Sequence, residues 1–127
     1  MSNFYNNKIE LKRNDFSFKN LQSKPKLTKE NGKHRMYIVY ATWCPHCSDP
    51  EFRKRYTILS DKLREKNIHL YAINSTNETM SDIADALNID GFPTLRYVSP
   101  NGKEEEYRGG RDMISMTNFF LEKIKKN

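Results

Sequence analysis

The chain has 127 residues, 36% of them hydrophobic and 30% charged, which is ordinary for a single water-exposed globular domain. No apolar stretch approaches the roughly 18 residues that span a bilayer, and the Asn-rich first eleven residues lack the apolar segment of a secretory signal. We therefore expect no membrane partner and a cytoplasmic location, with a virion or an organelle as open alternatives. The net charge is +6, but the basic residues are scattered without interleaved aromatic residues, so we expect no nucleic-acid partner.

The first third of the chain gives weak signals. A short strand is expected near residues 9–11, followed by a loop or short helix that Pro25 and the Asn31-Gly32 pair interrupt. We treat residues 1–35 as an N-terminal extension and residues 36–127 as the core, together forming a single domain.

The core shows a regular alternation of apolar runs and amphipathic segments. Pro50 falls early in the expected helix after Cys47 and kinks it or restarts it. Asn101-Gly102 is a strong hairpin turn. The expected elements are strands at 36–40, 68–73, 94–98 and 104–107, and helices from Cys47 to about 66, from 81 to 87 and at 113–125.

This order of elements predicts an α/β fold. Strand–helix–strand connections come first and produce parallel strands, and an antiparallel hairpin closes the sheet. A central mixed β-sheet with helices on both faces follows from this pattern.

The chain's two cysteines lie together in Trp43-Cys44-Pro45-His46-Cys47, directly after the strand at 36–40. A strand that delivers a Cys-x-x-Cys pair to a helix N-terminus places the first sulfur near unpaired N–H groups and the positive end of the helix dipole. Both favour the thiolate, which is the nucleophile of disulfide exchange. We predict that Cys44 attacks and that Cys47, one turn further and more buried, resolves.

The sequence resembles the thioredoxin superfamily, and within it the catalytic domains of protein disulfide isomerases. The resemblance covers roughly residues 36–124 and is carried by the Trp43–Cys47 segment, by Gly91-Phe92-Pro93-Thr94, by the Asn101-Gly102 turn and by Tyr107-x-Gly109-x-Arg111. It implies a thioredoxin-like fold and a thiol–disulfide oxidoreductase that acts on proteins bearing thiols or disulfides. It implies a monomer with a separate redox partner, and no cofactor beyond a reversible Cys44–Cys47 disulfide.

The resemblance also implies roles for the residues around the pair. Trp43 covers the site, and Pro45 and His46 tune the thiolate, with a protonated His46 favouring an oxidising pair. Pro93 follows a cis peptide bond and faces the cysteines, and Phe92 before it pairs with a substrate strand. Arg111 matches a residue that lowers the pKa of the second cysteine.

Two positions depart from the family pattern. Pro50 lies two residues earlier than the usual helix-kinking proline, which alters the helix beyond the site rather than the chemistry. The other departure is an absent acid. The family commonly buries a carboxylate six residues before the first cysteine, as proton acceptor for the second. Here that position is Ile38, so either exchange is slower or another group takes the proton.

Three other interpretations stay open. Gly109-Gly110-Arg111-Asp112 looks like the glutathione-binding turn of glutaredoxins, although Pro93 and Gly109 are spaced as in a thioredoxin-like hairpin. A metal site would combine Cys44, His46 and Cys47 with His34 or His69, but structural zinc sites normally have four ligands in paired spacings, so we expect none. A thioredoxin-fold binding or structural module with incidental cysteines is the third.

Overall fold

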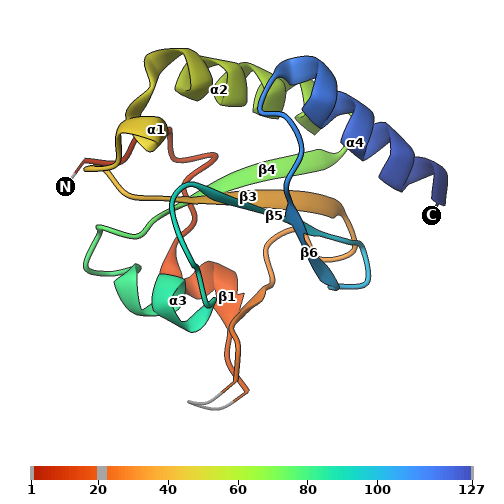
Figure 1. Ribbon diagram of the computed structural model, residues 1–127. Coiled ribbons are helices and arrows are strands. Elements are labelled where there is room, and N and C mark those ends of the chain that lie inside the picture. The colour runs from red at the N-terminus through yellow and green to blue at the C-terminus, as the bar shows by residue number, and fades with distance from the viewer. Residues whose placement is uncertain (1, 20–22, 127) are drawn as a thin grey trace.

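A four-stranded mixed sheet forms the centre of the molecule in a computed structural model that describes residues 2–19 and 23–126 (Figure 1). Its strands are β3 (His34–Tyr40), β4 (Ile68–Asn74), β5 (Thr94–Val98) and β6 (Glu104–Tyr107). Their order is β4-β3-β5-β6. β3 is parallel to β4 and antiparallel to β5, which is antiparallel to β6. The expected α/β, thioredoxin-like arrangement is confirmed.

Helices cover both faces of this sheet. α1 (Pro45–Ser48), α2 (Pro50–Arg64) and α4 (Met113–Lys126) lie on one side, and α3 (Ser81–Ala86) lies on the other together with β1 (Phe16–Ser17) (Figure 1). Each face has its own apolar core. The cluster under α2 and α4 contains both cysteines, and the cluster on the α3 side is built around Tyr37, Val39, Tyr71 and Ile73.

The N-terminal region adds structure that the sequence pattern did not reveal. The strand expected at residues 9–11 is reduced to one parallel bridge, between Glu10 and Ala72 of β4. A 3₁₀ turn (Arg13–Asp15) follows, and β1 (Phe16–Ser17) pairs antiparallel with β2 (Lys26–Leu27). Phe16 and Leu27 are buried in the α3-side core, so this region contributes to the folding of the core. The boundary at residue 35 stays a prediction.

The helix after the cysteines restarts at Pro50, as expected. α1 ends at Ser48, Asp49 caps the new helix by accepting a hydrogen bond from the Glu51 N–H (3.1 Å), and Pro50 occupies its first turn. Cys47 therefore belongs to a separate one-turn helix that precedes α2.

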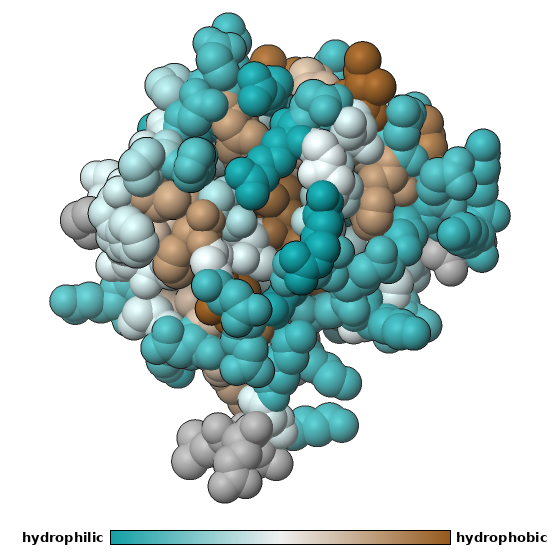
Figure 2. Space-filling model, viewed as in Figure 1, coloured by the Kyte–Doolittle hydropathy of each residue, from teal (hydrophilic) through white to brown (hydrophobic). Residues whose placement is uncertain are grey.

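The visible surface is mostly hydrophilic, with smaller apolar areas between the polar side chains (Figure 2). Within the described part of the chain, no helix has the length and apolar character needed to cross a membrane.

Candidate active site

The two thiols lie where β3 gives way to α1. Cys44 is the N-cap residue of α1, because Pro45 takes the first helical position. Both cysteines are free. Cys47 is 1% exposed and Cys44 6% exposed. Cys47 is therefore the more buried of the two, as predicted, but both thiols are buried.

The surroundings of Cys44 favour its thiolate. Burial raises the pKa of the Cys44 thiol, but hydrogen bonds from the Cys47 N–H, the Cys47 thiol and the His46 N–H, together with the charge of Arg111, outweigh it. The net result is a lowered pKa. The helix N-terminus thus acts on Cys44 as the sequence argument predicted.

Cys47 is shifted in the opposite direction. Burial is the main cause that raises its pKa, to about 12, and the neighbouring Cys44 raises it further, while the Ala41 backbone and Arg111 lower it. The pair is therefore asymmetric, with one thiol prone to ionise and one that holds its proton. Arg111 lowers the pKa of both thiols, so its expected electrostatic role reaches Cys44 as well as Cys47.

The loop before β5 faces Cys44. The Phe92–Pro93 peptide bond is cis, as the resemblance implied. The Cys44 Sγ lies 3.6 Å from the Phe92 carbonyl oxygen, to which it donates. The Trp43 ring packs edge-on against Phe92 at 5.7 Å between centroids, yet 67% of Trp43 is exposed. A cavity of about 450 Å³ is lined by Trp43 and Phe92 together with residues of α3.

Pro45 and His46 both lie on the exposed surface of α1. The contribution of His46 to the Cys44 thiolate that the structure shows comes from its backbone N–H. The tuning that we assigned to its imidazole stays a prediction.

A buried carboxylate at this end of the sheet escaped the sequence argument. Ile38 is apolar and 1% exposed, as its type suggests, but Glu10 is 4% exposed and belongs to the same side of the sheet as the cysteines. Its Oε2 accepts hydrogen bonds from the Tyr40 hydroxyl (2.5 Å) and the Tyr5 N–H (3.1 Å). The buried side of the sheet that holds the cysteines therefore contains a carboxyl group, which the N-terminal region supplies.

Burial raises the pKa of Glu10 from its ordinary value of 4.5 to about 7, despite the lowering effect of its hydrogen bonds. Tyr5 links this carboxyl with the cysteines: burial raises the pKa of Tyr5, Arg53 lowers it, and the charges of Glu10 and Cys47 both raise it. The Tyr5 ring also packs against Tyr40, 5.7 Å between centroids. The signal in the sequence was only a charged residue between two apolar ones, Ile9 and Leu11.

The residues of the alternative metal and glutathione sites lie away from the Cys pair or already have hydrogen-bond partners. His34 and His69 lie at the start of β3 and β4, at the opposite end of the sheet from the Cys pair. No group of metal-ligating side chains that could hold an ion occurs among residues 2–19 and 23–126. In the Gly-Gly-Arg-Asp segment, Asp112 caps α4 by accepting from the Ser115 N–H (2.8 Å), and the Gly110 carbonyl accepts from the Tyr107 hydroxyl.

The site is a dithiol whose two pKa values differ, and it lies between a strand end and a helix N-terminus. On a thioredoxin-like fold, these features belong to the class of thiol–disulfide exchange sites. The Thioredoxin family model matches residues 18–122. The chain belongs to this family.

The curated relatives are of the disulfide-isomerase type. A protein disulfide-isomerase of Schizosaccharomyces pombe is 38% identical over 99 residues, covering 74% of this chain and 26% of the relative. One from Datisca glomerata is 32% identical over 92 residues, covering 68% of this chain and 18% of the relative. The chain thus spans about a quarter or less of the length of these relatives. They support the expected oxidoreductase class.

Solved structures show the same fold. The fourth thioredoxin domain of ERdj5 superposes with a TM-score of 0.65 at 18% identity, covering 94% of this chain and 96% of the domain. Human ERp44 gives a TM-score of 0.67 at 20% identity, covering 95% of this chain and 30% of ERp44.

The expected cytoplasmic location is wrong. The curated relatives are protein disulfide-isomerases, and this points to a compartment other than the cytoplasm. The expectation rested on the composition of the first residues, which carries no information about the thiol chemistry that a compartment requires.

Proposed function

We propose that this chain catalyses thiol–disulfide exchange on protein substrates, with Cys44 as nucleophile and Cys47 as resolving thiol. The observation that carries the proposal is the asymmetry of the pair: the pKa of Cys44 is lowered and that of Cys47 is raised to about 12. An asymmetric pair attacks through one defined sulfur.

The reaction proceeds in two exchanges. The Cys44 thiolate attacks one sulfur of a substrate disulfide, so that the substrate S–S bond breaks, a mixed disulfide forms and the second substrate sulfur leaves as a thiolate that takes up a proton. The Cys47 sulfur then attacks the Cys44 sulfur. The mixed disulfide breaks, the substrate sulfur leaves as a thiolate that takes up a proton, and the Cys44–Cys47 disulfide forms. Two electrons have then passed to the substrate. The reverse sequence oxidises a substrate dithiol.

The second exchange needs a proton acceptor, because a thiol with a pKa of about 12 is rarely ionised at neutral pH. We assign this role to Glu10. It is the buried carboxyl among the described residues, it titrates near neutral pH, and Tyr5 experiences its charge and that of Cys47 together. Glu10 would thus replace the carboxylate that position 38 lacks.

The substrate is an extended polypeptide segment that carries a cysteine. It would lie along Phe92 and Pro93, whose loop already meets the Cys44 sulfur through the Phe92 carbonyl. The exposed indole of Trp43 and the adjacent cavity of about 450 Å³ provide apolar contact for side chains next to the reacting cysteine. A second thiol protein would regenerate the pair.

The test measures reduction of insulin disulfides and oxidation of a dithiol peptide by the purified chain. Cys44→Ser should lower both rates by about 10³-fold or more. Cys47→Ser should still attack and should accumulate a mixed disulfide, visible by mass spectrometry. The chain has only these two cysteines, so the adduct is assigned without ambiguity. Absence of turnover in the unmodified chain would identify a binding module instead.

A reduction potential separates the directions of flow. A value near about −270 mV indicates a reductase, and one between about −180 and −120 mV an isomerase or oxidase. Rapid, saturable reduction of the oxidised chain by glutathione would favour the glutaredoxin-like alternative.

A further inference from the structure

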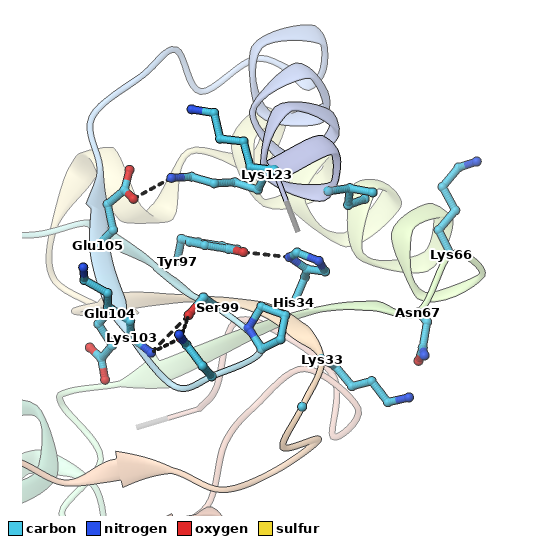
Figure 3. Close-up of a pocket in the computed structure, with 15 residues that line it drawn as sticks. Lys33, His34, Lys66, Asn67, Tyr97, Ser99, Lys103, Glu104, Glu105 and Lys123 are labelled. Atoms are coloured by element: carbon cyan, nitrogen blue, oxygen red, sulfur yellow. Dashed lines mark hydrogen bonds and ion pairs between the residues drawn. The ribbon is translucent and has the colours of Figure 1, made fainter.

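A second cavity lies at the other end of the sheet from the cysteines. It has a volume of about 720 Å³, and its walls come from the turn before β3, the α2–β4 turn, the β5–β6 hairpin and the end of α4 (Figure 3). β3 separates it from Cys44: His34 at the first position of β3 lines the cavity, and the cysteines follow its last residue, Tyr40. Seven strand residues correspond to about 20 Å.

Lysine side chains dominate the walls of this cavity. Five lysines and two glutamates line it, namely Lys33, Lys66, Lys103, Lys123, Lys126, Glu104 and Glu105.

Both carboxylates already have partners. Glu105 accepts from Lys123 at 2.6 Å (Figure 3). Glu104 accepts from the Tyr37 hydroxyl at 2.7 Å and pairs with Lys24, which lies outside the cavity, at 3.3 Å. The positive charges therefore exceed the negative ones around this space, and an anion that enters it lowers the repulsion among the lysines.

The inner surface of the cavity is polar and held in place. The Tyr97 hydroxyl and His34 Nδ1 are joined by a hydrogen bond of 2.7 Å (Figure 3). The Lys123 ammonium lies 5.4 Å from the centre of the Tyr97 ring and is held by Glu105, which keeps it on the cavity wall. The cavity thus combines hydrogen-bonded groups on its inner surface with lysine side chains in its walls.

We propose that this cavity binds a compact ligand that carries two or more phosphate charges. Its volume falls within the range of small-molecule sites, about 300–1,000 Å³. Lysines from four separate segments line it, so a single carboxylate would meet only some of them, whereas linked phosphates reach several at once. This site goes beyond the proposed exchange reaction and does not depend on it.

The test titrates inorganic pyrophosphate into the ¹⁵N-labelled chain and follows backbone amide shifts. Shifts confined to residues 32–34, 66–67, 97–105 and 123–126 are expected. The double variant Lys66→Gln/Lys103→Gln should bind at least about tenfold more weakly. The control Lys12→Gln/Lys54→Gln removes two exposed charges elsewhere and should change the affinity by less than about twofold.

Two results would overturn the proposal: equal weakening in both double variants, or shifts spread over the whole basic surface. Tighter binding of a hexaglutamate peptide than of pyrophosphate would also overturn it and would identify an acidic-peptide surface. The exchange rate, measured on the same samples, should be unchanged in both variants. Loss of exchange in the unmodified chain would count against the proposed function and not against this site.

Discussion

The two ends of β3 carry charge in different ways. At the carboxyl end, Cys44, Cys47 and Glu10 are nearly inaccessible, and burial and hydrogen bonds decide which of them is ionised. At the amino end, lysines from four segments line an open cavity. We therefore expect the groups at the carboxyl end of β3 to respond to pH and to neighbouring groups. The cavity at the amino end should respond to salt concentration.

The largest expected effect concerns Glu10. Its pKa rises from 4.5 in the unfolded chain to about 7 in the folded chain, so the folded chain holds the proton more tightly. The stability from this group is complete below about pH 4.5 and is lost as the pH rises to about 7, about 3 kcal/mol in all. Glu10→Gln should therefore be more stable than the unmodified chain at pH 8, by up to about 3 kcal/mol.

Urea unfolding at pH 4.5 and pH 8 measures this difference. Glu78→Gln, which changes an exposed carboxylate in a loop, serves as the control and should show the pH dependence of the unmodified chain. If Glu10 is the proton acceptor, Glu10→Gln should also slow release of the mixed disulfide while leaving the attack by Cys44 unchanged. Equal effects on both steps would contradict that role.

The sequence predicted the site at each end of β3 only where the residues of that site are close together in the chain. The cysteines and the Phe92-Pro93 pair belong to contiguous motifs, and the hairpin strands follow from alternation around Asn101-Gly102, so both were found. The burial of Glu10 depends on Tyr40, thirty positions away. No local pattern contains such a contact.

The sequence did not reveal β1, β2 or the lysine-lined cavity for the same reason: each depends on contacts between distant segments. β1 and β2 are two residues long each, too short for a periodic signal, and their apolar residues are recognisable only once they meet the α3-side core. The lysines of the cavity are scattered in the sequence and looked like an ordinary solvated surface. Only the meeting of four segments at the amino end of β3 brings them together.

The next largest effect is that of salt concentration, which should change ligand binding at the amino end of β3 more than the thiol pKa at the carboxyl end. Between about 0.01 M and 0.15 M ionic strength the Debye length falls from about 30 Å to about 8 Å. Pyrophosphate affinity should fall by about tenfold or more over this range, because it depends on exposed charges. The pKa of Cys44, followed by the ultraviolet absorbance of its thiolate, should change little, since its causes include short-range hydrogen bonds. A thiol pKa that moves as strongly as the affinity would remove the distinction.

Two substitutions, each of which removes one tyrosine hydroxyl, test whether the two ends of the sheet are independent. Tyr97→Phe removes the hydrogen bond to His34 at the amino end and should lower the free energy of unfolding by about 1 kcal/mol, weaken pyrophosphate binding and leave exchange unchanged. Tyr107→Phe removes the hydrogen bond to the Gly110 carbonyl, next to Arg111, and should leave pyrophosphate binding unchanged. Chemical denaturation, pyrophosphate titration and the exchange assay are applied to both variants. The same pattern for both variants would show that the ends are not independent.

The smallest expected effect is that of Arg111. Its charge lowers the pKa of both thiols, although its side chain is exposed and water weakens the interaction. Arg111→Gln should therefore raise the pKa of Cys44 and slow its attack by about two- to threefold at a pH below that pKa, whereas Arg111→Lys should preserve most of the rate. Arg108→Gln is the matched control, because Arg108 is exposed on the same loop and pairs with Glu106 at 3.0 Å. At a pH well above the Cys44 pKa the thiol is ionised in every variant, so the rates of Arg111→Gln and the unmodified chain should converge. A deficit that persists there would mean that Arg111 acts on the substrate rather than on the thiol.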